Sequence, residues 1–195
     1  MESKYRIDDY VKVARSTAIY PETAKFTYPV LGLAGEYGEV VDEVFLDAKI
    51  KPAKRALIAE LGDVLWYVFN TMLDLDLQVH DIADIVTGGL RCETFEDICF
   101  QRLKPRDGRS PWLKMTVHIG QLAEVAKKGL RDGYGPNLDE VKRSVCANAL
   151  AQILVSLCEI CDKQHLSLGE IAASNNRKLT SRKNRDKLKG DGNDR

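Results

Sequence analysis

Two pairs of acidic residues recur at helical spacing in the first third of the chain. Glu36 and Glu39 are three residues apart, and so are Glu60 and Asp63. Because residues at i and i+3 share one face of a helix, each pair presents its two carboxylates together. The neighbouring residues are apolar, and acids among core-forming residues are costly unless their charge is compensated. The pattern therefore predicts that two adjacent helices gather four carboxylates around a divalent cation.

The expected cation is Mg²⁺, with Mn²⁺ as an alternative. Magnesium takes oxygen ligands in octahedral geometry and usually keeps waters and substrate phosphates in its shell. Gly35, Gly38 and Gly62 leave space beside the acids and allow the helices to approach closely. A single acidic pair at this spacing is more often a solvated helix face than a ligand set. Two pairs, each next to glycine and set in an apolar helix, favour the metal site.

Apolar periodicity and breaker residues indicate the helices that must carry these acids. Pro29 falls in the first turn of the helix with the first pair, where a missing N–H costs little. Pro52 is expected to open the helix with the second pair. The fold class is expected to be all-α, a helical bundle. The expected helices cover residues 5–16, 28–49, 52–75, 77–87, 93–103, 111–130, 138–163 and 166–182.

A weak internal repeat relates the two halves of the chain. Only Glu39 keeps an acidic counterpart, Glu124, whereas the counterparts of the other three acids are Gln, Ala and Gln. The second half thus repeats the helical pattern without most of the acids. The paired segments are GEYGEVV at 35–41 with GQLAEVA at 120–126, ELGDVLWYV at 60–68 with ALAQILVSL at 149–157, and LQVHDIA at 77–83 with LSLGEIA at 166–172.

This repeat, together with a loop that contains two prolines and a glycine, gives the expected domain organisation. Residues 1–100 form the acid-bearing unit and residues 101–110 form a linker. Residues 111–182 form the degenerate unit, and residues 183–195 form a basic, irregular tail.

Composition argues against two classes of function, nucleic-acid binding and membrane insertion. Lys plus Arg and Asp plus Glu number 29 each, so the net charge is near zero and argues against a dedicated nucleic-acid surface. No apolar run approaches the length needed to span a membrane, and the charged start of the chain lacks a signal-peptide core. The five cysteines form no regular framework, which favours reduced thiols and a cytoplasmic location. Cys158 and Cys161 are expected to be buried free thiols rather than a zinc or redox site.

The ordered acids also carry a family resemblance. GLAGEYGEV followed by AELGDVLWYV resembles the E-x-x-E, spacer, E-x-x-D signature of the MazG-like all-α nucleoside triphosphate pyrophosphohydrolases. RSTAIYP at 15–21 is similar to a segment ahead of the first acidic pair in some bacterial and phage members, and the basic stretch at 177–195 is similar to their C-terminal ending. Such relatives are typically about half as long. The resemblance therefore implies a tandem pseudo-dimer, with the tail folded back onto the acids.

The resemblance implies an enzyme that converts a nucleoside or deoxynucleoside triphosphate to the monophosphate and pyrophosphate. Glu39 is the expected general base. The basic residues of the last helix and tail would neutralise the phosphates, and two residues on the acidic face of the helix at 52–75 would touch the sugar or base. The expected metal ligands are Glu36, Glu39, Glu60 and Asp63, and the expected substrate-binding residues are Tyr67, Asn70, Lys178, Arg182 and Arg185.

Two other functions stay open at the level of sequence. The same chemistry could hydrolyse a modified nucleotide or an alarmone. Alternatively, the chain could be a catalytically inactive helical regulatory or assembly protein, a role that the second half would suit. A further association of two chains into a homodimer is compatible with either class. The intact acid quartet of the first half favours the enzyme.

Overall fold

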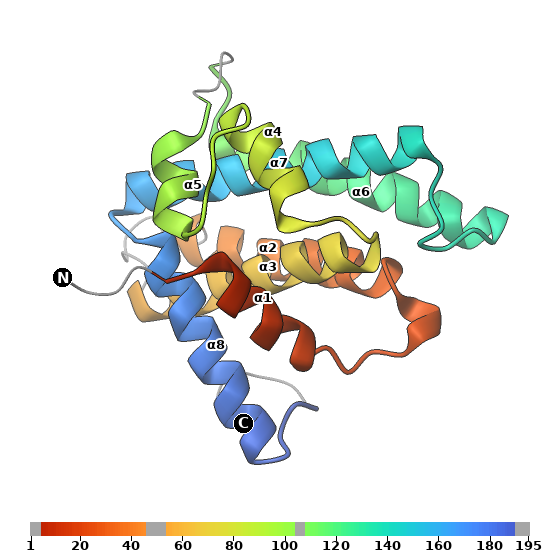
Figure 1. Cartoon of the computed structure of the whole chain (residues 1–195). Coiled ribbons are helices and arrows are strands. Elements are labelled where there is room, and N and C mark those ends of the chain that lie inside the picture. The colour runs from red at the N-terminus through yellow and green to blue at the C-terminus, as the bar shows by residue number, and fades with distance from the viewer. Residues whose placement is uncertain (1–4, 46–53, 104–107, 190–195) are drawn as a thin grey trace.

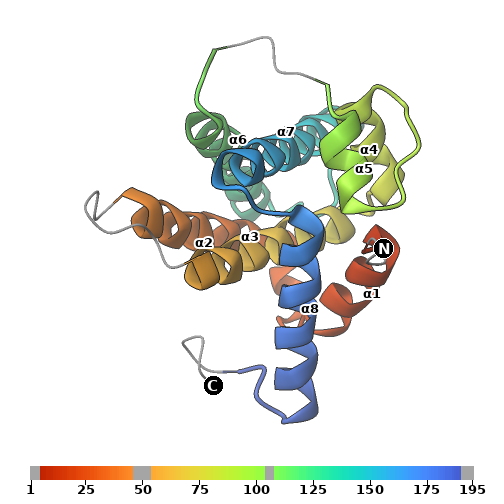
Figure 2. The ribbon, with the colours of Figure 1, turned by 90° about the vertical axis from the view of Figure 1, so that its left-hand side faces the viewer.

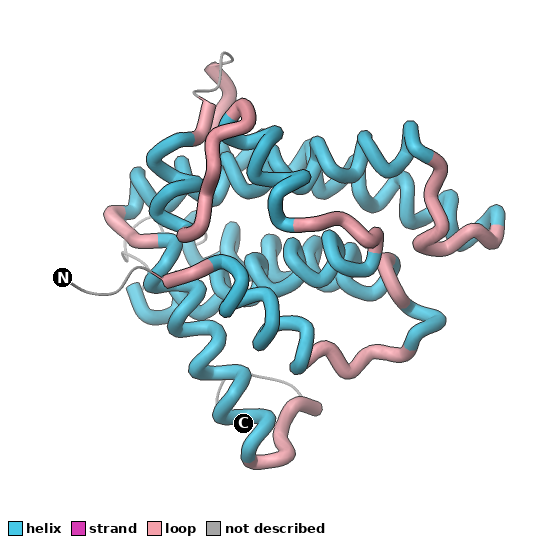
Figure 3. Tube along the Cα trace, in the orientation of Figure 1, coloured by secondary structure: helices cyan, strands magenta, loops and turns pink. Residues whose placement is uncertain are grey.

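The computed structural model describes residues 5–45, 54–103 and 108–189 of the chain. Within these ranges the secondary structure consists of α-helices and one short 3₁₀ helix, with no strand beyond an isolated bridge between Arg6 and Thr94 (Figure 3). The predicted all-α class is therefore confirmed. The helices in Figure 1 are α1 (Ile7–Ser16), η1 (Glu22–Ala24), α2 (Thr27–Phe45), α3 (Lys54–Asp74), α4 (Val79–Thr87), α5 (Phe95–Gln101), α6 (Pro111–Asp132), α7 (Glu140–Gln164) and α8 (Leu168–Asn184).

Two long helical hairpins form the centre of the molecule. Helix α2 packs along α3, α6 packs along α7, and α2 also contacts α6 (Figure 1). The core between them is apolar, and Leu33, Leu61 and Leu157 are completely buried. Burying such side chains contributes about 1.5–3 kcal/mol each relative to leaving them exposed. Packing of the hairpins therefore fixes the relative position of α2 and α3, which carry the predicted acids.

The helix that follows each hairpin packs on the opposite hairpin. Helix α8, which comes after α7, lies across α3, as Figures 1 and 2 show from two directions. Helix α4, which comes after α3, packs on α7. This exchange brings the C-terminal basic helix to the acid-bearing half of the chain.

The turns that lead into these two helices have matching backbone geometry. Asp76 and His165 both adopt the left-handed conformation, each with φ of 53°. The next residue donates its backbone N–H to the carbonyl five positions earlier, Leu77 to Met72 over 3.1 Å and Leu166 to Cys161 over 2.9 Å. These two turns fall where LQVHDIA aligns with LSLGEIA in the internal repeat. Their shared geometry supports the duplication of the two halves, which remains a prediction.

Most predicted helix boundaries agree with the structure to within a few residues. The expected end of the second helix at Lys49 and the expected start at Pro52 lie outside the described residues. The last helix continues to Asn184, two residues beyond its predicted end at Arg182 and into the predicted irregular tail. A turn then follows, and Lys189 is the last residue that the structure describes.

The expectation of reduced thiols is wrong for two cysteines. Cys99 on α5 and Cys158 on α7 are joined by a disulfide, with their Cα atoms 5.3 Å apart. The bond links residues 59 positions apart, so it follows from the packing of α5 on α7 rather than from local spacing. Cys161 is buried and free, as predicted, and burial raises the pKa of its thiol to about 12.

Helices α3 and α7 are long and apolar enough to cross a membrane by length and composition, contrary to the expectation from the sequence. In the folded chain, 61% of the most apolar stretch of α3 and 72% of that of α7 are buried. The core that these helices form accounts for their apolar composition without a membrane.

Candidate functional site

Three of the four predicted metal ligands lie together. Glu36 on α2 and Glu60 and Asp63 on α3 each offer a carboxylate oxygen, and these oxygens all lie within 4.8 Å of one another. Glu60 is buried, and the other two side chains are half-buried. Three carboxylates at this separation repel one another strongly when partly removed from water. Such an arrangement needs a proton or a cation to compensate its charge.

The titration of Glu36 reflects this crowding. Burial is the largest cause that raises its pKa, and the nearby carboxylates add to it, so that the pKa is about 7 instead of the ordinary 4.5. Lys178 acts in the opposite direction. Near neutral pH, Glu36 is therefore poised between its protonated and ionised forms. A divalent cation can displace that proton, because metal ligands must be deprotonated to bind.

The fourth predicted ligand, Glu39, lies about one turn further along α2. Its side chain is exposed, and its charge contributes to the raised pKa of Glu36. It lies outside the close group formed by the other three acids. Its predicted roles as ligand and general base therefore stay predictions.

Helix α8 brings two polar side chains onto Asp63. Lys178 forms an ion pair with Oδ2, and the Nδ2 of Asn175 donates a hydrogen bond of 2.8 Å to Oδ1. A Cβ atom on Gly62 would lie 2.9 Å from that of Asn175, so the close approach of α3 and α8 requires glycine there. The predicted return of the basic end to the acids is thus observed for Lys178. Asn175 was missed, although it lies three residues before Lys178 on the same face.

The other two predicted phosphate-binding residues differ in their positions. Arg182 lies one turn beyond Lys178 and is buried. It lines a cavity that Glu36 and Asp63 also line. Arg185 follows the last residue of α8, is exposed, and donates its Nε–H to the backbone carbonyl of Ser181 over 3.2 Å. The structure therefore brings Lys178 and Arg182 to the site, whereas the substrate-binding role of Arg185 stays a prediction.

A cavity of about 470 Å³ opens beside the acids. Glu36, Asp63 and Arg182 are among the residues that line it. Four aromatic side chains, those of Tyr20, Tyr28, Trp66 and Tyr67, form an aromatic part of its wall, and Tyr67 is one of the predicted substrate-binding residues. A Cβ atom on Gly32 would lie 2.2 Å from the Tyr67 ring, so glycine in α2 makes room for that ring. The cavity therefore combines acids, the cationic residues Arg182 and Lys189, and flat aromatic surfaces.

Two further tyrosines of this wall were not predicted. The rings of Tyr20 and Tyr28 stack with centroids 4.8 Å apart, and Tyr20 meets Trp66 edge-on at 6.3 Å. Such offset and edge-to-face contacts are favourable between aromatic rings. Tyr20 belongs to the RSTAIYP segment, so its presence there was the available signal. Periodicity could not reveal it, because the segment is not helical.

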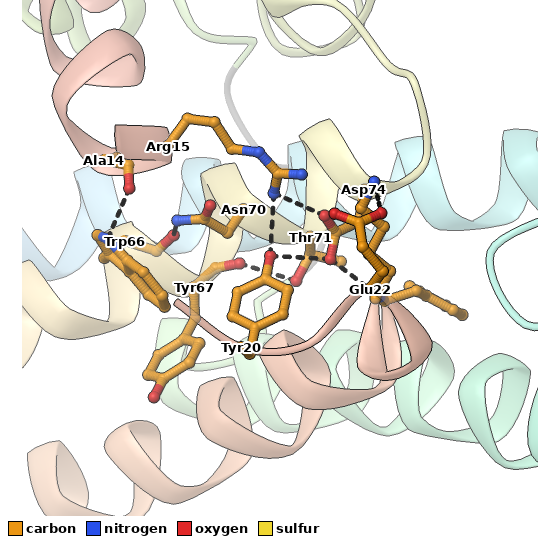
Figure 4. Close-up of polar contacts among 11 residues, drawn as sticks. Ala14, Arg15, Tyr20, Glu22, Trp66, Tyr67, Asn70, Thr71 and Asp74 are labelled. Atoms are coloured by element: carbon orange, nitrogen blue, oxygen red, sulfur yellow. Dashed lines mark hydrogen bonds and ion pairs between the residues drawn. The ribbon is translucent and has the colours of Figure 1, made fainter. Parts of the chain in front are cut away.

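Asn70, the other predicted substrate contact, is completely buried. Its Nδ2 donates a hydrogen bond of 3.0 Å to the backbone carbonyl of Trp66 on the same helix (Figure 4). The indole Nε1 of Trp66 in turn donates to the Ala14 carbonyl over 3.1 Å. In this structure Asn70 supports the helix behind the cavity wall, and Trp66, expected to be core, is buried and also lines the cavity.

The corresponding positions of the second half do not form a similar group within the described residues. Gln121 and Glu124 are exposed on α6, and Ala149 is buried in the core. Glu124 forms ion pairs with Lys127 and Lys128 on its own helix. The candidate site is therefore built from the acids of the first half and the last helix of the second.

Comparison with known proteins gives one informative relative. The Gene 37 protein of Mycobacterium phage L5 is 36% identical over 92 residues, which cover 40% of this chain and 78% of that protein. The chain belongs to the family of the Gene 37 protein. No family model matches the chain, and no solved structure matches it. The name Gene 37 protein states neither an activity nor a ligand, so the functional argument for this family member rests on the geometry of the site.

Proposed function

We propose that the chain is a Mg²⁺-dependent pyrophosphohydrolase that converts a nucleoside or deoxynucleoside triphosphate to the monophosphate and pyrophosphate. The observation that carries the proposal is the group of Glu36, Glu60 and Asp63 beside a cavity that also contains Arg182 and an aromatic wall. The resemblance of the acid motifs to MazG-like enzymes supports it. The proposal includes a cytoplasmic site of action and a pseudo-dimeric chain, alone or as a homodimer.

The donor set fits the proposed metal. The three side chains offer only carboxylate oxygens, which are the ligands that Mg²⁺ prefers, and their oxygens lie close enough to share one ion. Mn²⁺ accepts the same ligand type. When bound, the metal would lower the pKa of a coordinated water and polarise the phosphates. Lys178 and Asn175 would keep the Asp63 carboxylate oriented through the two contacts described above.

The proposed reaction is attack of water on the α-phosphorus. A bond forms between the water oxygen and the α-phosphorus, and the bond from that phosphorus to the α,β-bridging oxygen breaks, so that pyrophosphate leaves. Glu39 would accept the proton of the attacking water as general base. Arg182 and Lys178 would stabilise the negative charge that grows on the leaving pyrophosphate. The flat rings of Tyr67 and its neighbours would hold the sugar and base.

A nucleotide screen tests the proposal. Purified protein with Mg²⁺ is incubated with canonical and modified nucleoside triphosphates and with alarmones, and pyrophosphate and monophosphate are measured together. Equal release of both products is expected, and it should be lost in Asp63→Asn. Glu124→Gln is the control, because it removes an exposed acid of the second half, the counterpart of Glu39, that lies outside the acidic group.

Other outcomes separate the competing functions. Products from an alarmone or modified nucleotide alone would assign the same chemistry to a different substrate. Release of inorganic phosphate without pyrophosphate would indicate a different reaction. No product with any nucleotide, in a protein that remains helical, would favour the non-enzymatic regulatory or assembly role.

A further inference from the structure

Asp74 is an unusual acid at the C-terminal end of α3, away from the metal-ligand group. Its side chain has no exposed surface, although it is ionisable. It accepts hydrogen bonds from Arg15 Nη1 over 2.7 Å and from the Tyr20 hydroxyl over 2.8 Å (Figure 4). The backbone N–H of Phe26 donates a third bond of 2.8 Å to it. Burial of this acid is thus compensated by donors from α1, from the segment after α1, and from the residue just before α2.

These donors bracket the segment that forms the outer wall of the cavity. Residues 17–26 connect α1 to α2, and Thr17, Ile19, Tyr20 and Pro21 within it line the cavity. Asp74 therefore accepts hydrogen bonds both from Tyr20, in the middle of this segment, and from Phe26, at its end. Arg15 reinforces the middle, because its Nη1 also donates to the Tyr20 hydroxyl over 3.1 Å.

The far end of the wall also carries backbone strain. Phe26 has a φ of 64°, a left-handed conformation that is rare for a bulky residue, and its side chain is completely buried. Such a conformation persists only where the surrounding structure holds it in place. The bond from the Phe26 N–H to Asp74 is one of the contacts that do so.

The tyrosine hydroxyl is suited to this contact. Burial and the neighbouring Asp74 carboxylate raise the pKa of Tyr20 well above its ordinary value, so the hydroxyl stays protonated and remains a donor. The ring is then fixed between Tyr28, on which it stacks, and Trp66, which it meets edge-on. Fixing the hydroxyl therefore fixes the face that the ring presents to the cavity.

We infer that Asp74 is a positioning residue that sets the aromatic wall of the cavity through Tyr20 and thereby determines how tightly the sugar–base portion of the substrate is held. Asp74 itself touches no substrate, because its side chain is fully buried behind the wall. The inference rests on the proposed function, since it assigns the wall to the nucleoside end of the ligand. The proposed metal ligands Glu36, Glu60 and Asp63 take no part in the Asp74 contacts, so the metal site should be unaffected.

The first test measures the wall without any nucleotide. Hydrogen exchange is followed by mass spectrometry in the parent protein, in Asp74→Asn and in Tyr20→Phe. Asp74→Asn should raise exchange in the peptide covering residues 17–28 at least tenfold while the α6–α7 core stays protected. Tyr20→Phe, which keeps the ring and removes only the hydroxyl, should raise it less. Asp76→Asn is the control, because Asp76 is an exposed acid two positions away.

The second test measures the reaction of the same variants. The expected result is a KM about tenfold higher in Asp74→Asn with kcat within twofold of the parent value, since loss of uniform binding raises KM alone. Tyr20→Phe should raise KM by a smaller factor, and it serves in place of Asp74→Asn if that variant fails to fold. Increased exchange with an unchanged KM, or an unchanged exchange pattern, would overturn the positioning role.

The two tests also separate this inference from the proposed function. If the parent protein hydrolyses no nucleotide, the proposed function fails and the role of Asp74 in substrate binding fails with it. If hydrolysis is observed but Asp74→Asn lowers kcat with KM unchanged, the proposed function stands and the positioning role is wrong.

Discussion

Lys178 on α8 forms an ion pair with Asp63 on α3, across 115 positions of the sequence. Both side chains are mostly buried, with 19% and 17% of their surfaces exposed. The contact therefore lies in a region where charges interact more strongly than on an open surface. It joins the acid-bearing half of the chain to the last helix of the other half at the centre of the candidate site.

Replacing this lysine should impair catalysis. Lys178→Met keeps much of the side-chain length and removes the charge that faces the acids and the expected phosphates. We expect kcat to fall on the order of 10²-fold, as for other groups that stabilise charge in a transition state. Lys183→Met is the control, because Lys183 is an exposed basic residue on the same helix. Equal activities of the two variants would contradict the assignment.

The raised pKa of Glu36 predicts how stability varies with pH in metal-free protein. Between about pH 4.5 and 7 this carboxyl is ionised in the unfolded chain but still protonated in the folded one. The folded state then binds more protons, so the free energy of unfolding falls as pH rises through this window. We expect a loss on the order of 2 kcal/mol, which allows for the solvent that reaches this half-buried group.

Urea unfolding with a chelator present, from pH 4.5 to 8, checks this prediction. Glu36→Gln cannot ionise, so it should be more stable than the parent at pH 8 and should lose this part of the pH dependence. Added Mg²⁺ should stabilise the parent more at pH 8 than at pH 6, because the cation competes with the proton. The idea fails if parent and variant show the same pH dependence.

Two glycines provide a matched test of helix packing. Gly62→Ala would place a Cβ atom 2.9 Å from that of Asn175, so we expect a loss of about 1–3 kcal/mol in unfolding free energy. Gly35→Ala meets no atom within 4 Å, so the higher helix propensity of alanine should add about 0.5–1 kcal/mol. Denaturant unfolding of both variants measures the difference. Equal effects would mean that α8 does not approach α3 as described.

The disulfide predicts a specific response to reductant. Without reductant, thiol titration of the denatured chain should find three free thiols, and with reductant five. Reduction should lower the free energy of unfolding by about 3–4 kcal/mol, because the bond closes a loop of 59 residues. Cys99→Ser should have the lower stability at once and show no further response. Cys92→Ser, which removes a free thiol, should still respond like the parent.

The helices were predictable because their apolar periodicity is strong and is interrupted at prolines and glycines. The acids of α2 and α3 were predictable for a related reason, since spacing within a helix fixes which side chains share a face. Glu36, Glu60 and Asp63 accordingly lie together. The return of Lys178 to Asp63 was expected only from the family resemblance, because no local rule relates residues so far apart.

The features that were missed all depend on contacts between distant segments. The anchoring of Tyr20 by Asp74 joins a non-helical segment to the end of α3, and although Tyr20 belongs to the RSTAIYP segment, no pattern pairs it with Asp74. The disulfide between Cys99 and Cys158 depends on how two helices pack. Asn70 shows the limit of spacing alone, because it shares the acidic face but is completely buried, and its predicted contact with substrate stays a prediction.

The exchange of α4 and α8 between the hairpins has a consequence for how the protein can be divided. Each half of the chain supplies something that the other lacks: the first supplies the carboxylates, and the second supplies the helix that carries Lys178. Neither half on its own contains a whole site. Two separately expressed fragments would therefore have to associate before the site could form. Any activity of the mixture would then measure that association.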